Sequence, residues 1–242
     1  MNKLLTTVFA LAVACVTSVA LAQMSPATAP VQAPTRAGSD TAGVNGPKSL
    51  EAKVAQCIGC HSIIGYKGTF PEVYRVPMIA GQNAKYIAAA LNAYKAGDRK
   101  HPTMRGIAQS LTDQDIADIS SYYEALGKKH VKPAADKPSR EPSTQVAALL
   151  QKAACASCHG ANMSKPIDPS YPKIAGQYGD YLFVALKAYK TDNNAAIGRN
   201  NGVMGAIAKQ FSNAELKAIS EYIGSLQTEM ATVPQPKLHR ND

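Results

Sequence analysis

The feature that most constrains this chain is a five-residue pattern that occurs twice, as CIGCH at residues 57–61 and as CASCH at residues 155–159. Its two thiols lie one helical turn apart and can add to the two vinyl groups of one porphyrin. The adjacent histidine then lies beneath the iron, and C-x-x-C-H is the attachment signature of c-type haem. The chain is therefore predicted to carry two covalently bound haem c groups. The predicted attachment and iron-binding residues are Cys57, Cys60 and His61 for haem 1, and Cys155, Cys158 and His159 for haem 2.

The cysteine count leaves two other chemistries to weigh. Of five cysteines, only Cys15 lies outside the two motifs. An even number of cysteines in an exported chain is also typical of a disulfide scaffold. Four cysteines could bind zinc, although a zinc site of this kind is rare in exported chains and leaves both motif histidines unexplained. The C-x-x-C-H spacing favours haem over both.

The first 22 residues have the features of a secretory signal peptide. Lys3 supplies the positive charge, residues 4–19 are mostly apolar, and Ala20-Leu21-Ala22 is a small-x-small cleavage site. The alternatives are an uncleaved membrane anchor and a lipoprotein signal with Cys15 as the lipidated residue, although a proper lipobox is lacking. We expect a cleaved, soluble chain in the periplasm.

An internal repeat locates the second iron ligand of each haem. Residues 77–95 match residues 172–190 with 11 of 19 identical, and residues 104–126 match 204–226. Of seven methionines, only Met104 and Met204 align with each other, and each follows a loop and precedes a helix. A thioether opposite histidine is a common c-type ligand pair. We predict that Met104 binds the iron of haem 1 and Met204 that of haem 2.

Other readings of these side chains stay open at this point. Most methionines in proteins only fill the core, and Met78 competes with Met104 for haem 1. The remaining histidines, His101, His130 and His239, are expected to be solvated. A backbone carbonyl near Pro77 or Pro172, in the shared P-x-I-A-G-Q segment, is expected to accept the N–H of the motif histidine.

Each repeat is predicted to contain three helices. The first ends in the haem motif (49–61 and 143–159), and the second covers 83–96 and 178–191. The third begins at an N-cap pattern, Thr112-x-x-Asp115 in one repeat and Ser212-x-x-Glu215 in the other. Paired tyrosines on the second helix are expected to pack in the core; contact with a haem propionate is the alternative.

The predicted organisation has six segments: signal peptide 1–22, flexible arm 23–47, domain 48–127, Pro-rich extended linker 128–142, domain 143–228 and tail 229–242. The net charge is +9, but the chain has no run of five basic residues, so nucleic acid is not an expected partner. No segment after the leader is apolar enough to span a membrane.

Together the two haem motifs, the duplicated P-x-I-A-G-Q segment, the methionine after a variable loop and the capped last helix resemble the dihaem cytochrome c4 family over residues 45–228. The resemblance implies an all-α fold of two tandem class I cytochrome c domains. It also implies periplasmic electron transfer, often toward a terminal oxidase. One departure is Ser62 after the first motif, where glycine is usual and where the second repeat has Gly160; this residue puts the shape of that loop in doubt.

These observations favour a non-enzymatic electron carrier of a respiratory chain. Its expected partners are redox proteins: a cytochrome, copper protein or quinol-oxidising complex as donor and a terminal oxidase as acceptor. A monomer is favoured, and peripheral membrane association is left open. The alternatives are a haem subunit of a larger dehydrogenase or oxidase, with the arm and tail as docking segments, and a dihaem peroxidase-type enzyme. The Asn-rich loop 192–203 is expected to make the two haem environments unequal.

Overall fold

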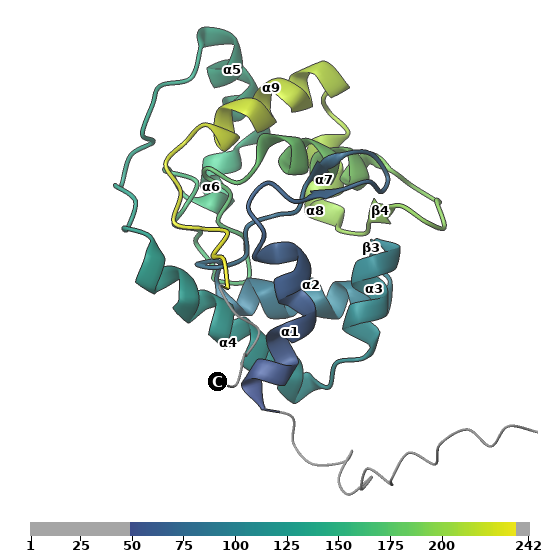
Figure 1. The fold of residues 1–242 in the computed structure, drawn as a ribbon. Coiled ribbons are helices and arrows are strands. Elements are labelled where there is room, and N and C mark those ends of the chain that lie inside the picture. The colour runs from purple at the N-terminus through teal and green to yellow at the C-terminus, as the bar shows by residue number, and fades with distance from the viewer. Residues whose placement is uncertain (1–48, 236–242) are drawn as a thin grey trace, which may run out of the picture. The chain divides into compact units, whose positions relative to one another are not determined.

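The computed structural model describes residues 49–235. The predicted signal peptide and arm, His239 and the last part of the predicted tail lie outside the described residues. Helices dominate this part of the chain (Figure 1), and the predicted all-α class is confirmed. The helices are α1 (Leu50–His61), α2 (Ala84–Ala96), α3 (Pro102–Gln109), α4 (Asp113–His130), α5 (Thr144–Ala153), α6 (Cys155–His159), α7 (Gly179–Lys190), α8 (Gly202–Ala208) and α9 (Asn213–Gly224).

Within residues 49–235, four two-residue strands form two small antiparallel pairs. The first pair lies within the first repeat, and the second joins the two repeats. The strands are β1 (Lys67–Gly68), β2 (Tyr74–Arg75), β3 (Arg99–Lys100) and β4 (Gly198–Arg199). The β3–β4 pair places Arg99 directly opposite Arg199.

The last helix of each repeat begins as the sequence predicts. The Thr112 side chain accepts the N–H of Asp115 at the start of α4, while the Asp115 carboxylate accepts the N–H of Thr112. Ser212 and Glu215 form the same capping box at the start of α9. Each box satisfies two backbone N–H groups that the first helical turn would otherwise leave unpaired.

The segment between the repeats is shorter than predicted. Helix α4 continues to His130, so the first residues of the expected extended linker are helical, and only residues 131–142 are irregular. Gly127 makes this continuation possible, because a Cβ at this position would lie 2.0 Å from the backbone of Gly81. The helix therefore passes directly over the P-x-I-A-G-Q segment and ends beyond it.

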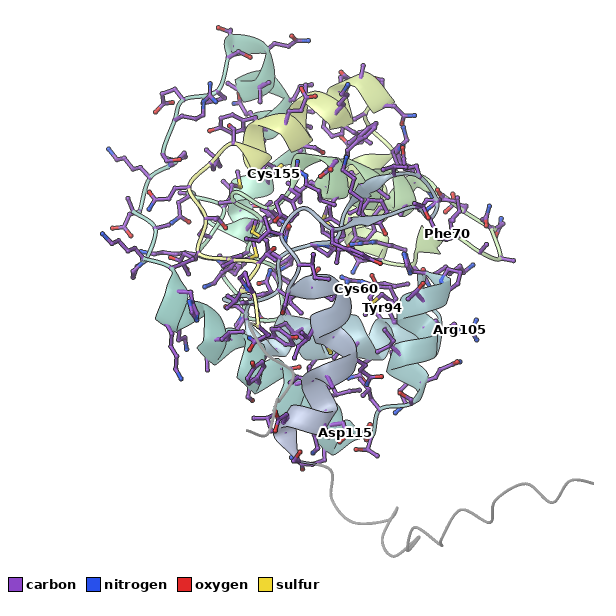
Figure 2. All side chains as sticks on the ribbon, in the orientation of Figure 1. Cys60, Phe70, Tyr94, Arg105, Asp115 and Cys155 are labelled. Carbon is purple, nitrogen blue, oxygen red and sulfur yellow. The ribbon has the colours of Figure 1, made fainter. Side chains whose placement is uncertain are left out.

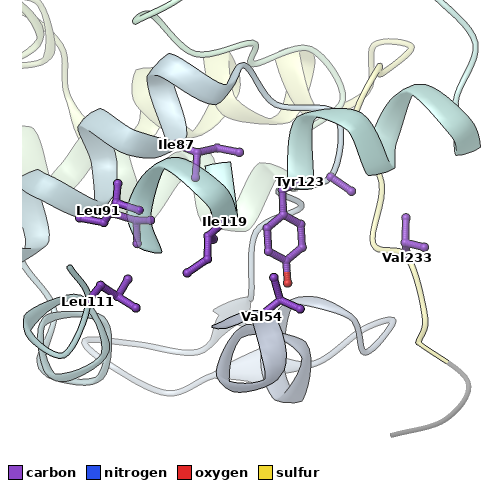
Figure 3. Close-up of a cluster of buried hydrophobic side chains, with 9 residues drawn as sticks. Val54, Ile87, Leu91, Leu111, Ile119, Tyr123 and Val233 are labelled. Carbon is purple, nitrogen blue, oxygen red and sulfur yellow. The ribbon is translucent and has the colours of Figure 1, made fainter. Parts of the chain in front are cut away.

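Each repeat has its own hydrophobic core. In the first, residues of α1, α2 and α4 meet around Ile119 and Tyr123, and Figure 3 shows the Tyr123 ring beside Val54 of α1. In the second, residues of α5, α7 and α9 meet around Leu216, Ile219 and Ile223. The two cores have the same arrangement of helices, as the internal repeat predicts.

The beginning of the predicted tail is part of the fold. Ala231 pairs with Ala80 of the first repeat, and Val233 enters the first core (Figure 3). Glu229 forms an ion pair with Lys173 of the second repeat at 2.7 Å. Residues 229–233, which we call the C-terminal strap, thus contact both repeats and are not free to serve as a docking segment.

Candidate haem sites

In the first repeat, the haem motif occupies the last turn and a half of α1. Ser49 caps the start of this helix through a hydrogen bond from the N–H of Ala52. Cys57 packs against the first core and Cys60 is half-buried nearby, labelled in Figure 2. Burial raises the pKa of the Cys57 thiol to about 11.

In the second repeat, the single helix predicted over 143–159 is interrupted. Ala154 has a positive φ of 49° and separates α5 from the short α6, which carries Cys155, labelled in Figure 2. The hydroxyl of Ser157 donates to the carbonyl of Ala154 at 2.6 Å. The first repeat has Gly59 at the matching position, which lacks a hydroxyl, and its helix is continuous.

Both motif histidines are oriented by a proline carbonyl, as predicted. The Nδ1 of His61 lies 2.8 Å from the carbonyl oxygen of Pro77, and the Nδ1 of His159 lies 2.9 Å from that of Pro172. A carbonyl can only accept, so each Nδ1 carries the proton and donates. The lone pair of Nε2 is then available for a metal. Burial also lowers the pKa of both histidines and favours the neutral ring.

The loops after the two histidines differ at the position where the sequence departs from the family pattern. Ser62 has φ −108°, an ordinary conformation for any residue. Gly160 has φ +82°, and a Cβ there would lie 2.0 Å from the carbonyl oxygen of Lys165. The second loop therefore requires glycine, while the first follows a path that accepts serine.

Met104 and Met204 lie inside short helices, α3 and α8, which the sequence analysis missed. The backbone N–H of Met104 donates to the ring of His101 at 3.3 Å, and that of Met204 donates to the Asn201 side chain at 2.9 Å. Met104 packs against the first core together with Cys57. These helix starts could have been predicted from the alignment of His101 with Asn201, because asparagine is a strong N-cap residue.

His101 was expected to be solvated, but it is half-buried with both ring nitrogens engaged. Nδ1 caps α3, and Nε2 lies 3.0 Å from the Tyr74 hydroxyl. The reason is its N-cap position, which draws the ring against the helix that it starts. His130 is exposed at the end of α4, as expected.

Two arginines that the sequence analysis did not single out lie where the repeats meet. Arg99 donates to the Tyr86 hydroxyl and Arg199 to the Tyr181 hydroxyl, both at 3.0 Å. Each guanidinium also lies 5.3–5.6 Å from two tyrosine ring centres, the second rings being Tyr94 and Tyr189. The tyrosines predicted to pack in the core thus surround two cations. The sequence did hold a signal for these arginines: Arg99 and Arg199 are 100 residues apart, the same spacing that relates Met104 to Met204.

The donor set fits haem c. Each repeat offers two thiols on one helical turn and an imidazole whose Nε2 is free for iron. Across the described residues, neither Arg99 nor Arg199 has an ion pair with a carboxylate. Two guanidiniums without acidic partners suit an anionic group, and the propionates of haem supply one. No four-cysteine cluster occurs within residues 49–235.

Comparisons with known proteins agree with this geometry. The cytochrome c family profile matches residues 44–126 and 143–227. Cytochrome c4 of Pseudomonas aeruginosa is 28% identical over 180 residues, covering 73% of this chain and 86% of that protein. The crystal structure of reduced recombinant cytochrome c4 from Pseudomonas stutzeri has a TM-score of 0.52 at 25% identity, covering 74% of this chain and 97% of that chain. A thiosulfate dehydrogenase electron acceptor of Thiomonas intermedia is 26% identical, covering 72% of this chain and 79% of that protein.

Proposed function

Because this chain belongs to the cytochrome c family, with one match in each repeat, we propose that it is a periplasmic carrier that passes electrons along a respiratory chain toward a terminal oxidase. The resemblance to dihaem cytochrome c4 is confirmed by the relatives of that name, as are two covalent haem c groups and electron transfer. The compartment, the respiratory role and the direction of transfer are the proposal.

The residues proposed to hold the haems are those of the sequence prediction. Cys57 and Cys60 would attach haem 1, and Cys155 and Cys158 would attach haem 2. His61 and Met104 would be the protein ligands of the first iron, and His159 and Met204 those of the second. The haem supplies one-electron chemistry when bound. The protein contributes orientation of the imidazoles by the two proline carbonyls, which is the observation that carries this proposal.

The surroundings of the sites support a carrier rather than a catalyst. An enzyme acting on peroxide needs one iron with an open side and a group that moves protons there. His101 is the histidine nearest Met104 in sequence, but both of its ring nitrogens are already hydrogen-bonded. With Met104 and Met204 as further ligands of the two irons, electron transfer would be the chemistry available.

Docking of redox partners is supported by apolar side chains exposed just after the haem motifs. Ile64 is 72% exposed after the first motif, and Ile167 is 71% exposed after the second. We propose that these side chains contribute to the contact surface for redox partners. The signal peptide predicted at residues 1–22 supports export, and the basic balance of the chain supports an acidic partner. Within the described residues, no helix has the length and apolar character needed to cross a membrane.

The experiment is a stopped-flow assay of the purified holoprotein between a quinol-oxidising membrane fraction and a terminal oxidase. We expect rapid reduction and reoxidation, slowed by rising ionic strength because charge steering is screened. Peroxide turnover should stay at the level of free haem. Oxidation by peroxide but not by the oxidase would contradict the proposal.

A second candidate is a haem acceptor that works bound to a dehydrogenase. The relative named thiosulfate dehydrogenase electron acceptor favours it. Size-exclusion chromatography of native periplasm separates the two candidates. A free carrier elutes near its mass of 25.5 kDa or less, whereas a bound subunit elutes with its dehydrogenase.

A further inference from the structure

Two buried glutamines cross between the repeats at the segment that orients the histidines. Gln82 and Gln177 end the two P-x-I-A-G-Q segments and are 3% and 4% exposed. The side chain of Gln177 accepts the N–H of Met78 at 3.1 Å and donates to the Met78 carbonyl at 2.9 Å. Gln82 makes the same two bonds to Lys173, at 3.0 and 2.9 Å. Each glutamine therefore binds the residue after the proline of the opposite repeat.

That position matters because of how a peptide bond is built. The N–H of Met78 and the carbonyl of Pro77 belong to the same peptide unit, and this carbonyl accepts the N–H of His61. A continuous chain of hydrogen bonds thus runs from His61, through one peptide, to Gln177. The matching chain runs from His159 through the Pro172–Lys173 peptide to Gln82.

Hydrogen bonds in such a chain strengthen one another. When Gln177 accepts the N–H of the peptide, the peptide becomes more polarised and its oxygen a better acceptor. A stronger bond from the imidazole N–H raises the basicity of the ring as a ligand. A more basic axial ligand favours ferric iron and lowers the reduction potential, which second-shell hydrogen bonds are known to tune.

We propose that Gln82 and Gln177 are positioning residues that act crosswise: Gln177 lowers the reduction potential of haem 1, and Gln82 lowers that of haem 2. Each haem is then tuned by the repeat that does not hold it. This inference rests on the iron ligands assigned under the proposed function. It also assigns the interface a role beyond holding the repeats together.

The C-terminal strap completes the arrangement. Met230 is 1% exposed, and its sulfur lies 3.4 Å from the side-chain nitrogen of Gln82 and 3.8 Å from that of Gln177. Met230 therefore belongs to the same network of hydrogen bonds. A matched control is Tyr178→Phe, because the Tyr178 hydroxyl contacts Thr232 of the strap at 3.0 Å and binds neither glutamine side chain.

The test is a haem-resolved redox titration of the holoprotein by NMR, with Gln177→Met and Gln82→Met. Methionine keeps the length and removes the amide. We expect Gln177→Met to raise the potential of haem 1 alone and to shift the His61 Nδ1–H resonance, and Gln82→Met to do the same for haem 2 and His159. Tyr178→Phe should leave both potentials at their wild-type values.

Other results overturn the proposal. They are a shift of both haems together, a shift of the haem in the mutated repeat, no shift, or an equal shift in Tyr178→Phe. If a methionine variant does not fold, Gln177→Asn and Gln82→Asn, which withdraw the amide by one methylene, should give smaller shifts with the same crosswise pattern. Failure of the proposed function is seen separately: the wild-type oxidised protein would then lack the thioether–iron absorption band.

Discussion

The two repeats place the same haem-motif side chains on backbones that differ just before the motif. In the first repeat the haem motif lies on one continuous helix, and in the second the helix breaks at Ala154 just before the motif. Yet the histidine-to-carbonyl distances are 2.8 and 2.9 Å. The imidazoles are thus oriented by a contact made outside the helix that carries them. Tertiary hydrogen bonds define these sites, and the local helix can vary.

The ligand assignment gives the largest expected effect and compares the repeats directly. In Met104→Ala and Met204→Ala, one haem of each protein loses its thioether while the other keeps it. We expect each variant to lose about half of the thioether–iron charge-transfer absorption and to bind carbon monoxide at one reduced haem, as optical spectra can measure. An unchanged spectrum for Met104→Ala would point to Met78 as the ligand of haem 1.

The loops after the histidines should differ in their tolerance of a Cβ. Gly160→Ala places a Cβ 2.0 Å from the Lys165 carbonyl at φ +82°. Strain and collision together should cost about 3 kcal/mol in the free energy of unfolding. Ser62→Ala, at the matching position, should cost less than about 1 kcal/mol, since its φ suits any residue. Denaturant unfolding of the holoprotein measures both, and equal losses would contradict the contrast.

Because the helix breaks at Ala154, a glycine substitution there should change protein stability in the opposite direction from one in the continuous helix α1. Ala154 has φ +49°, which costs a residue with a side chain about 1–2 kcal/mol. Ala154→Gly should therefore stabilise the protein by up to about 1 kcal/mol. Gln56→Gly, at the matching site in the continuous helix α1, should destabilise it by about 1 kcal/mol. Thermal melting of the two variants gives the comparison, and a common sign would show that the backbones are alike.

The smallest effect concerns acid sensitivity of the two capping boxes. Hydrogen bonds from Thr112 and the ion pair with Lys53 lower the pKa of Asp115 to about 2, from 3.8. Its stabilising contribution is complete above pH 3.8 and is lost as the pH falls toward 2. Among the described residues, Glu215 of the second repeat has the cap bonds but no ion pair with a lysine, and the hydrogen bonds from Ser212 also lower its pKa.

The variants Asp115→Asn and Glu215→Gln separate these contributions. We expect Asp115→Asn to lower stability at neutral pH and to flatten the dependence of unfolding on pH between about 4 and 2. Glu215→Gln should flatten it less. Urea titrations at several pH values provide the measurement, and a larger change for Glu215→Gln would contradict the ranking.

Local patterns predicted the parts of the fold that depend on neighbouring residues. The capped starts at Thr112 and Ser212 were visible because a capping box spans four residues. The bond from His61 to Pro77 was also foreseen, since the proline recurs in the repeat. The helix break at Ala154 was not foreseen, because the apolar periodicity of residues 143–159 continues across it.

Contacts between the repeats could not be read from the sequence in this way. Gln82 reaches Lys173, and Arg99 lies opposite Arg199, across about 90 to 100 residues. Each residue was visible in the repeat alignment, but an alignment states equivalence and says nothing of contact. The strap was missed for a related reason: residues 229–233 have no counterpart in the first repeat and no helical period.

The most direct test of the account is an optical and near-infrared spectrum of the intact oxidised holoprotein, combined with a pyridine haemochrome assay. The account predicts two haem c groups per chain, both low-spin with histidine and methionine ligands, and no carbon monoxide bound after reduction. One haem per chain, a high-spin signal or a pair of histidine ligands at either iron would contradict it.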